Sequence, residues 1–350
     1  MTATAEPPPI RLTELTDCGG CAAKLGADLL AEALAGLGAQ ASPQELLIGL
    51  ETPDDAAVYQ LGEGLAILGT LDFFPPLVDD PATFGAIAAA NAVSDVFAMG
   101  GRVLFALSIA AFPEALPREA LATIFSAAAQ TVREAGGVLA GGHTIRDPEP
   151  KYGLAVIGAA DPTRLLRKNG ARPGDRLLLT KALGTGLIVS GSRRGAATGA
   201  DLDAAIASMR TLNRAASEAL VAAGVRGATD VTGFGLIGHA TEMARTANVR
   251  LVLEAGSLPA LRGALELAAR GVETDGALHN RRFAAPTYTC HTDVHRAQEA
   301  LAFDPQTSGG LLAAVAPAHV EAVEAAFRSA GQTCWWIGRA EEGLGVELEP

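Results

Sequence analysis

Five aspartates stand at places in the sequence where a carboxylate could take part in chemistry. Two precede an expected strand, one ends a strand, one lies in an expected helix and one opens a glycine-rich turn: Asp54, Asp55, Asp72, Asp95 and Asp230. Asp95 follows Asn91 by four residues, so both side chains share one face of the expected helix, among small apolar residues. Because a buried carboxylate without a partner is costly, Asp95 must find one.

The stretch between Lys24 and Arg102 contains no lysine or arginine that could be this partner. That scarcity favours a hard cation held by oxygen ligands. A helix cap, or a salt bridge to a basic residue from elsewhere in the chain, is the alternative.

Two cysteines and a lysine form a second group of candidate residues. Cys18 and Cys21 form a C-x-x-C pair, and Lys24 follows three residues later in a stretch of small residues. The pair fits a redox couple, one nucleophile beside a bystander, or half of a zinc site. The remaining zinc ligands would be Cys290, His291 and His295, but their spacing is not that of a zinc finger. The Lys24 ammonium would favour a thiolate, and small residues suit a segment that closes over a ligand. An inert thiol beside a solvated lysine is the alternative.

Residues 233–238 match the G-x-G-x-x-G pattern of dinucleotide-binding proteins, and Glu254 follows at about the expected distance. That pattern requires an apolar strand leading into the first glycine. Here polar residues led by Asp230 precede it, and a carboxylate would repel a pyrophosphate unless a cation lay between them. A nicotinamide-dependent oxidoreductase is therefore disfavoured, and the P-loop pattern is absent.

The elements that must position these residues alternate between strands and helices, which predicts two α/β units. Expected strands cover 56–60, 65–71, 103–111, 153–160, 176–180, 249–254, 310–316 and 332–338. Expected helices cover 26–37, 81–99, 117–135, 201–223 and 236–246. A boundary is expected at 161–175, where Asp-Pro and Arg-Pro-Gly-Asp sequences flank a basic stretch.

Composition excludes several classes of protein. The 350 residues are 49% apolar and 19% charged, which excludes a disordered chain. A net charge of −12 and 5% aromatic residues disfavour binding to nucleic acid or to an anionic membrane surface. A polyphosphate stays compatible if metal ions lie between the negative groups. No apolar run is long enough to span a bilayer, no signal peptide is expected, and four cysteines make no disulfide framework. We therefore expect a cytoplasmic protein.

Seven motifs in order make the sequence similar to the selenophosphate synthetases, also called selenide, water dikinases. They lie at residues 20–24, 51–58, 71–74, 91–101, 141–144, 229–235 and 304–310, and the resemblance runs from about residue 12 to residue 338. The sequence departs from the family at two places. Ala23 replaces a second cysteine, and Pro53 stands where many members have arginine.

The resemblance implies an α/β (α+β) fold of the aminoimidazole ribonucleotide synthetase type. Residues 1–45 would form a flexible N-terminal segment with a Cys/Lys lid and a helix, 46–160 an ATP- and metal-binding domain, and 173–350 a C-terminal domain. Two copies would join their N-terminal sheets into a barrel, giving a homodimer with ATP in a groove at the dimer.

The reaction implied by the resemblance converts ATP, selenide and water into selenophosphate, AMP and orthophosphate. The implied magnesium ligands are Asp55, Asp95 and Asp230. The implied nucleotide contacts are Lys24, Thr52, Pro53, Asp54, Asp72, Asn91, Asp95, Gly142, His143 and Thr144. Cys21 would handle selenium, and Lys24 would neutralise charge on the transferred phosphoryl group. The alternatives are a kinase or ligase of the same fold with a small organic substrate, or a selenium carrier that binds ATP without turnover.

Overall fold

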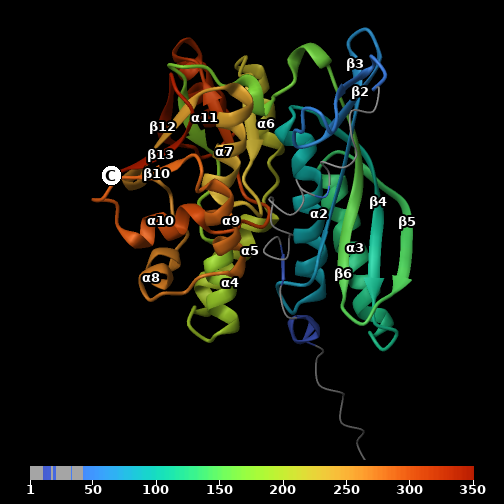
Figure 1. Cartoon of the computed structure of the whole chain (residues 1–350). Helices are drawn as coiled ribbons and strands as arrows, with labels where there is room; N and C mark the ends of the chain where they lie inside the picture. The colour runs from blue at the N-terminus through green and yellow to red at the C-terminus, as the bar shows by residue number, and fades with distance from the viewer. Residues whose placement is uncertain (1–10, 17–18, 21–32, 34–41) are drawn as a thin grey trace, which may run out of the picture.

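The structure is a computed structural model that describes residues 11–16, 19–20, 33 and 42–350. Cys18, Cys21, Lys24 and nearly all of the expected helix over 26–37 lie outside the described residues. The rest of the chain folds into two halves, each built on one mixed β-sheet with helices against it (Figure 1).

The N-terminal half contains a six-stranded sheet in the order β1-β2-β3-β6-β4-β5. All neighbouring strands are antiparallel except β4 and β5, which are parallel. The strands are β1 (Leu46–Ile48), β2 (Ala57–Gly62), β3 (Leu65–Phe74), β4 (Arg102–Phe112), β5 (Val138–Arg146) and β6 (Lys151–Ala160). Among the residues that the structure describes, this half carries the α-helices α2 (Pro81–Ala98) and α3 (Arg118–Glu134).

Helix α2 begins and ends where the sequence predicts. The Asp80 carboxylate accepts a hydrogen bond from the Thr83 backbone N–H at 2.7 Å, and Pro81 occupies the first helical position. After Met99 the chain turns at Gly100, whose φ of +73° is readily adopted by glycine.

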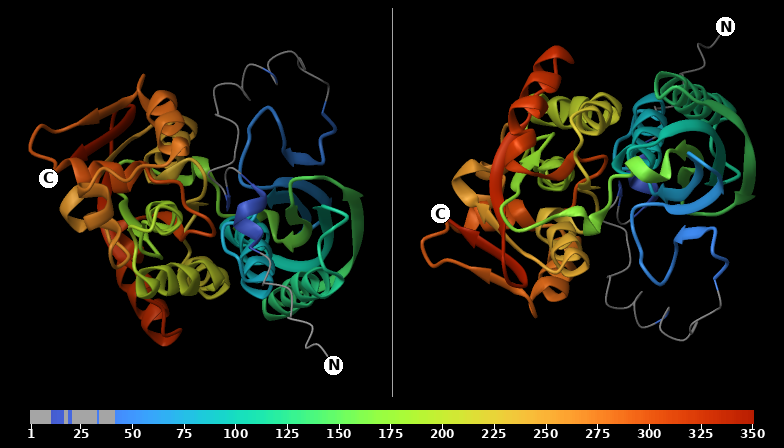
Figure 2. Two further views of the ribbon diagram at one scale, coloured as in Figure 1. Left: turned by 90° about the horizontal axis from the view of Figure 1, so that it is seen from below. Right: turned by 90° about the horizontal axis from the view of Figure 1, so that it is seen from above.

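Helix α2 is buried on all sides because it lies between the two halves (Figures 1 and 2). It packs on β3 and β6 of the N-terminal sheet and on α3, and it also contacts the C-terminal half. Its small residues allow this close approach: a Cβ on Gly85 would lie 2.3 Å from the Ile124 carbonyl oxygen of α3. Polar side chains of α2 therefore face other protein groups rather than bulk water.

The C-terminal half contains a seven-stranded sheet in the order β10-β13-β9-β12-β7-β11-β8. The strands are β7 (Arg176–Leu179), β8 (Gly227–Asp230), β9 (Arg250–Glu254), β10 (Tyr288–Cys290), β11 (Leu311–Val315), β12 (Trp335–Glu341) and β13 (Gly345–Glu349). The helices are α4 (Thr185–Arg193), α5 (Gly199–Arg210), α6 (Arg214–Ala222), α7 (Gly235–Ala247), α8 (Ala264–Ala269), α9 (Asp275–Ala284), α10 (Arg296–Phe303) and α11 (Val320–Ser329).

The expected single helix over 201–223 is wrong, because the chain breaks between α5 and α6. The Lys181 ammonium donates a hydrogen bond to the Thr211 carbonyl at 2.6 Å. The Asn213 amide donates to the Gly309 carbonyl at 2.8 Å and to Ser94 Oγ of α2 at 2.9 Å. These contacts come from distant parts of the chain, so local propensity does not reveal the break.

Candidate functional site

A pocket of about 210 Å³ lies where the two halves meet, and we call it the acidic pocket. Its lining residues come from the loop before β2, from α2, from the short turn η4 (Lys168–Gly170), and from β8 and α7. They are Pro53, Asp54, Asp55, Asp95, Lys168, Asp230, Thr232, Phe234, His239, Glu242, Arg245 and Thr246.

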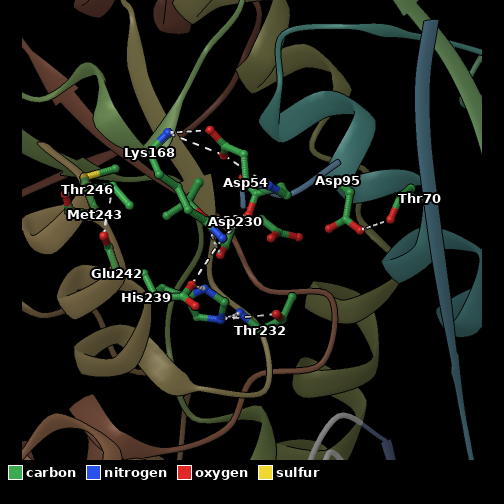
Figure 3. Close-up of polar contacts among 12 residues, drawn as sticks. Asp54, Thr70, Asp95, Lys168, Asp230, Thr232, His239, Glu242, Met243 and Thr246 are labelled. Atoms are coloured by element: carbon green, nitrogen blue, oxygen red, sulfur yellow. Dashed lines mark hydrogen bonds and ion pairs between the residues drawn. The ribbon is translucent and has the colours of Figure 1, made fainter. Parts of the chain in front are cut away.

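All three predicted metal-ligating carboxylates reach this pocket from separate elements, and Figure 3 shows two of them, Asp95 and Asp230. Asp55 lies just before β2, Asp95 in the last turns of α2, and Asp230 at the end of β8. Strand β8 is buried along its whole length, so its last residue emerges at the pocket with little freedom to move. The fold therefore brings together carboxylates that are up to 175 residues apart in sequence.

Hydroxyl groups fix two of these carboxylates. Thr70 of β3 donates to Asp95 Oδ2 at 2.5 Å. Ser94, buried on α2, donates to Asp230 Oδ2 at 2.6 Å and accepts from the Asn213 amide. The first pair joins α2 to the N-terminal sheet and the second joins α2 to β8 of the C-terminal sheet, so both carboxylate positions depend on how α2 packs between the sheets.

The acidic pocket holds more negative charge than its surroundings neutralise. Burial raises the pKa of Asp95 well above its usual range, and the nearby carboxylates of Asp230, Asp72 and Asp55 raise it further. Burial and the adjacent Asp55 carboxylate raise the pKa of Asp54 to about 7. Burial also raises the pKa of Asp55, although Lys168 opposes this.

Lys168 is the lysine in direct contact with this group of acids. Its ammonium lies 3.0 Å from Asp55 Oδ1 and 3.1 Å from Glu242 Oε2, and its backbone N–H donates to Asp54 Oδ2 at 3.1 Å. Burial alone would lower the pKa of Lys168, but Asp55 and Glu242 raise it well above its usual value. The lysine is therefore charged in the pocket.

The donor atoms fit a divalent metal ion. Asp55 Oδ2 is a buried oxygen that accepts no hydrogen bond, and the crowded carboxylates of Asp95 and Asp230 gain from an added positive charge. Among the described residues, no three His, Cys, Asp or Glu side chains already lie close enough together to hold an ion. The carboxylates of Asp55, Asp95 and Asp230 would therefore have to draw together around a cation.

A second buried network continues from the acidic pocket along α2. The Asn91 amide donates to Asp72 Oδ2 at 2.8 Å, and its oxygen accepts the Ser308 backbone N–H at 2.8 Å. Ser308 has a φ of +49°, an unusual conformation that the loop over 304–310 sustains with its buried contacts. This network ties Asp72 on β3 to the loop of the seventh motif.

Comparison with known proteins identifies the family. Models of the AIR synthase related protein match this chain, the N-terminal domain over residues 53–160 and the C-terminal domain over residues 172–349. A selenide, water dikinase of Myxococcus xanthus (strain DK1622) is 44% identical over 335 residues, covering 95% of each chain. One of Geobacter metallireducens is 45% identical over 323 residues, covering 92% of this chain and 94% of the relative. This chain belongs to the selenide, water dikinase family.

The fold agrees with this assignment. The crystal structure of tt0281 from Thermus thermophilus matches with a TM-score of 0.72 at 23% identity, covering 93% of this chain and 97% of that one. At that identity the likeness shows the fold alone. The expected α/β fold of the aminoimidazole ribonucleotide synthetase type is thus confirmed.

Several residues that family resemblance assigns to the nucleotide lie apart from the acidic pocket of the same chain. Gly142, His143 and Thr144 are exposed on β5, an edge strand of the N-terminal sheet. Thr52 is exposed in the loop before β2, whereas Pro53 and Asp54 line the pocket. The glycine pair at 141–142 belongs to strand β5, which the sequence did not predict.

The dinucleotide pattern over 233–238 does not have the geometry of a Rossmann unit. Three strands, β11, β7 and β12, separate β8 from β9, which carries Glu254. Asp230 at the end of β8 belongs to the acidic pocket. Gly235 instead begins helix α7 with a φ of +68°, and a Cβ there would lie 2.8 Å from the Phe303 carbonyl oxygen.

The remaining zinc candidates do not form a site with one another in the described part of the chain. Cys290 is an exposed free thiol on β10, and His295 Nδ1 accepts the Ala297 backbone N–H as the cap of α10. His291 lies at the protein surface beside Asp293. Each residue has a local role, and no group of three metal-ligating side chains is present in the described ranges.

The sequence reading missed Lys168, Glu242 and Asn213. Lys168 lies in the basic stretch where the sequence predicts a domain boundary, and a lysine in a boundary segment is expected to be exposed. Glu242 lies seven residues into α7, one turn after His239, and this spacing places both side chains on one helix face. That spacing was the one available signal.

Proposed function

We propose that this protein catalyses the ATP-dependent synthesis of selenophosphate from selenide and water. The γ-phosphoryl group of ATP would pass to selenium, and water would then split the resulting ADP into AMP and orthophosphate. The observation in the structure that carries the proposal is the acidic pocket, where Asp55, Asp95 and Asp230 converge from both halves. Such a set of acids suits a polyphosphate only through cations.

The residues that would hold Mg²⁺ are Asp55, Asp95 and Asp230. When bound, the metal would neutralise charge on the phosphates and bridge them to the carboxylates. The chain prepares these ligands by fixing Asp95 through Thr70 and Asp230 through Ser94. Because phosphoryl transfer depends on positioning more than on covalent help, this preorganisation is the main contribution of the described residues.

The nucleotide contacts are proposed from family resemblance and fall into two groups. Asp54, Pro53 and Asp95 line the acidic pocket, and Asp72 is held beside Asn91 by a 2.8 Å hydrogen bond. Thr52 lies at the exposed edge of the same loop. The second group is Gly142, His143 and Thr144 on the exposed edge strand β5, where they would complete the nucleotide site of a second copy.

In a homodimer, Gly142, His143 and Thr144 of one copy would contact the nucleotide bound to the other copy. Helices α2 and α3 lie against the N-terminal sheet, yet large apolar side chains are exposed on its strands. They are Tyr59, Leu61, Leu65, Leu71, Phe73, Leu107, Val138 and Ile145. Exposed apolar surface of this extent is typical of an interaction site, and joining two such sheets would cover it.

Cys21 and Lys24 would carry the selenium and phosphoryl chemistry, since they match the Cys/Lys motif of the family. Both lie outside the described residues, but the chain just before them is placed. The Gly20 N–H donates to the Pro75 carbonyl at 2.9 Å, and a Cβ on Gly20 would lie 2.6 Å from Thr307 Oγ1. Thr307 adjoins Ser308, which bonds Asn91. The described first residue of the Cys/Lys motif, Gly20, therefore lies beside the networks around α2.

We also propose that the enzyme works in the cytoplasm, where selenide and a reactive thiol stay reduced. The described cysteines Cys290 and Cys334 are free thiols. No helix among the described residues is long and apolar enough to cross a bilayer.

The identity of the nucleotide product distinguishes the proposed function from that of a kinase of the same fold: the former releases AMP and the latter ADP. Radiolabelled ATP is incubated anaerobically with the protein, Mg²⁺ and selenide, and the products are separated by ion-exchange chromatography. We expect AMP and orthophosphate to form in equal amounts and only when selenide is present. ADP as the final product would contradict the proposal and favour an ADP-forming kinase.

A further inference from the structure

Lys168 occupies a place in the acidic pocket that the proposed reaction does not explain. Its side chain is only 10% exposed, and that of its partner Asp55 is 3% exposed. Asp55 Oδ1 accepts from Lys168 and also from Thr229 Oγ1 at 2.8 Å, while Asp55 Oδ2 accepts nothing. An ammonium is thus bound to a carboxylate that the proposed function needs as a metal ligand.

An ammonium and a divalent cation compete for the same carboxylate. Charges of like sign repel strongly in a buried site, so a cation at Asp55 would destabilise Lys168 where it now lies. Leaving Lys168 without any anion would in turn cost several kcal/mol, because a buried unpaired charge is unfavourable. The lysine therefore needs a second anionic partner outside the set of metal ligands.

Glu242 on α7 supplies that partner. Its Oε2 lies 3.1 Å from the Lys168 ammonium, on the side of the pocket formed by α7 (Figure 3). Burial would raise the pKa of Glu242, but the Lys168 ammonium lowers it below its usual value, so the carboxylate is charged.

His239 lies beside Glu242 on the same face of α7. The Thr232 backbone N–H donates to His239 Nε2 at 3.1 Å, so this nitrogen is an acceptor and the ring proton lies on Nδ1. Nδ1 lies 3.6 Å from Glu242 Oε2. Glu242 Oε2 therefore faces both the imidazole of its own helix and the Lys168 ammonium.

We infer that Lys168 is a positioning residue that holds Asp55 in the metal-free protein and moves onto Glu242 when a divalent cation binds. In the metal-free state the ammonium offsets the crowded carboxylates and keeps them in place. When a cation takes Asp55, Glu242 retains the ammonium, so the pocket gains the metal without leaving Lys168 unpaired. This inference rests on the proposed function, since it assumes that Asp55 is a metal ligand.

The test measures cation binding directly rather than activity. Mn²⁺ is titrated into the protein and free Mn²⁺ is measured by electron paramagnetic resonance, with and without the β,γ-methylene analogue of ATP. Glu242→Gln leaves Asp55 as the main ionic partner of Lys168, so we expect Mn²⁺ to bind roughly tenfold more weakly. Lys168→Met removes the competitor, so Mn²⁺ should bind at least as tightly as in the unaltered protein. Without metal, Lys168→Met should melt at a lower temperature than the unaltered protein.

The double variant decides whether Glu242 acts through Lys168. In the Lys168→Met background, Glu242→Gln should have no further effect on Mn²⁺ affinity. An equal weakening in both backgrounds would overturn the inference, because Glu242 would then act on the cation itself. Lys151→Met is the matched control, since Lys151 also contacts two carboxylates, Asp147 at 3.4 Å and Glu149 at 2.9 Å, outside the acidic pocket. It should leave Mn²⁺ affinity unchanged.

Two further outcomes separate this inference from the proposed function. If Lys168→Met does not fold, as judged by circular dichroism, Lys168→Gln replaces it, because glutamine keeps a donor towards Asp55 without the charge. Unaltered protein that makes selenophosphate while every variant binds Mn²⁺ within twofold of it would overturn the inference alone. Unaltered protein that binds no Mn²⁺ even with the nucleotide analogue would overturn the inference and the magnesium assignment together.

Discussion

Replacing Asp95 by asparagine should stabilise the metal-free protein and abolish its turnover of ATP. Burial and the carboxylates of Asp230, Asp72 and Asp55 raise the pKa of Asp95, so its ionised form opposes folding at neutral pH. Asparagine has nearly the same shape and still offers an oxygen to the Thr70 hydroxyl. Substitutions that change a buried charge typically alter the free energy of unfolding by about 1–3 kcal/mol, so we expect a gain of that size at pH 8.

The gain should depend on pH in a defined direction. A carboxyl group whose pKa is raised by folding contributes most to stability below its unfolded pKa of 3.8, where it is protonated in both states. That contribution is lost as the pH rises towards the folded pKa. The difference between Asp95→Asn and the unaltered protein should therefore be small near pH 4 and largest at alkaline pH.

Thermal unfolding in EDTA over a pH series measures this effect, and we expect the melting temperature to rise by about 2–6 °C at pH 8. Adding Mg²⁺ with the ATP analogue should stabilise the unaltered protein more than the variant. Asp161→Asn is the control, because a backbone hydrogen bond from Thr163 lowers the pKa of Asp161 and the change should bring no gain. An Asp95→Asn variant that is less stable at pH 8 without metal would refute the reasoning.

The other predictions concern the metal, the thiols, the core and the dimer. Asp230→Asn should reduce AMP release at least 100-fold with an unchanged circular dichroism spectrum, and turnover near that of the unaltered protein would remove Asp230 from the ligand set. Cys21→Ser should abolish selenophosphate formation while Cys18→Ser has a mild effect; the reverse order would mean that Cys18 is the reactive thiol. Lys181→Met should lower the free energy of unfolding in urea by about 1–3 kcal/mol, because the buried Ser308 carbonyl and the part-buried Thr211 carbonyl lose their donor. Phe73→Asp on the exposed sheet face should convert a dimer to a monomer in light scattering, and a dimer that persists would place the interface elsewhere.

The elements that carry strong local signals could be predicted from the sequence. The Asp80 cap, Pro81 and Gly100 define α2, and the apolar runs define β3, β4 and β6 within a few residues. The family resemblance selects Asp55, Asp95 and Asp230, and the lack of basic residues between Lys24 and Arg102 supports this choice for Asp55 and Asp95. In the structure these three residues line one pocket.

What could not be predicted depends on contacts between distant parts of the chain. Lys168 meets Asp55 across 113 residues, and no local pattern marks that lysine as buried. The break before Asn213 follows from its bonds to Ser94 and Gly309. The sequence did not predict the short strand β8, because its four residues, Gly-Ala-Thr-Asp, have little strand propensity. Antiparallel pairing with β11 stabilises it.

The most direct test of the central claim is phosphorus NMR of the protein with ATP, Mg²⁺ and selenide under anaerobic conditions. The proposed function predicts a selenophosphate resonance, split by the selenium-77 nucleus when labelled selenide is used, which grows together with AMP and orthophosphate. The same signal should be absent with Asp230→Asn. Consumption of ATP without a phosphorus–selenium signal in the unaltered protein would contradict the claim.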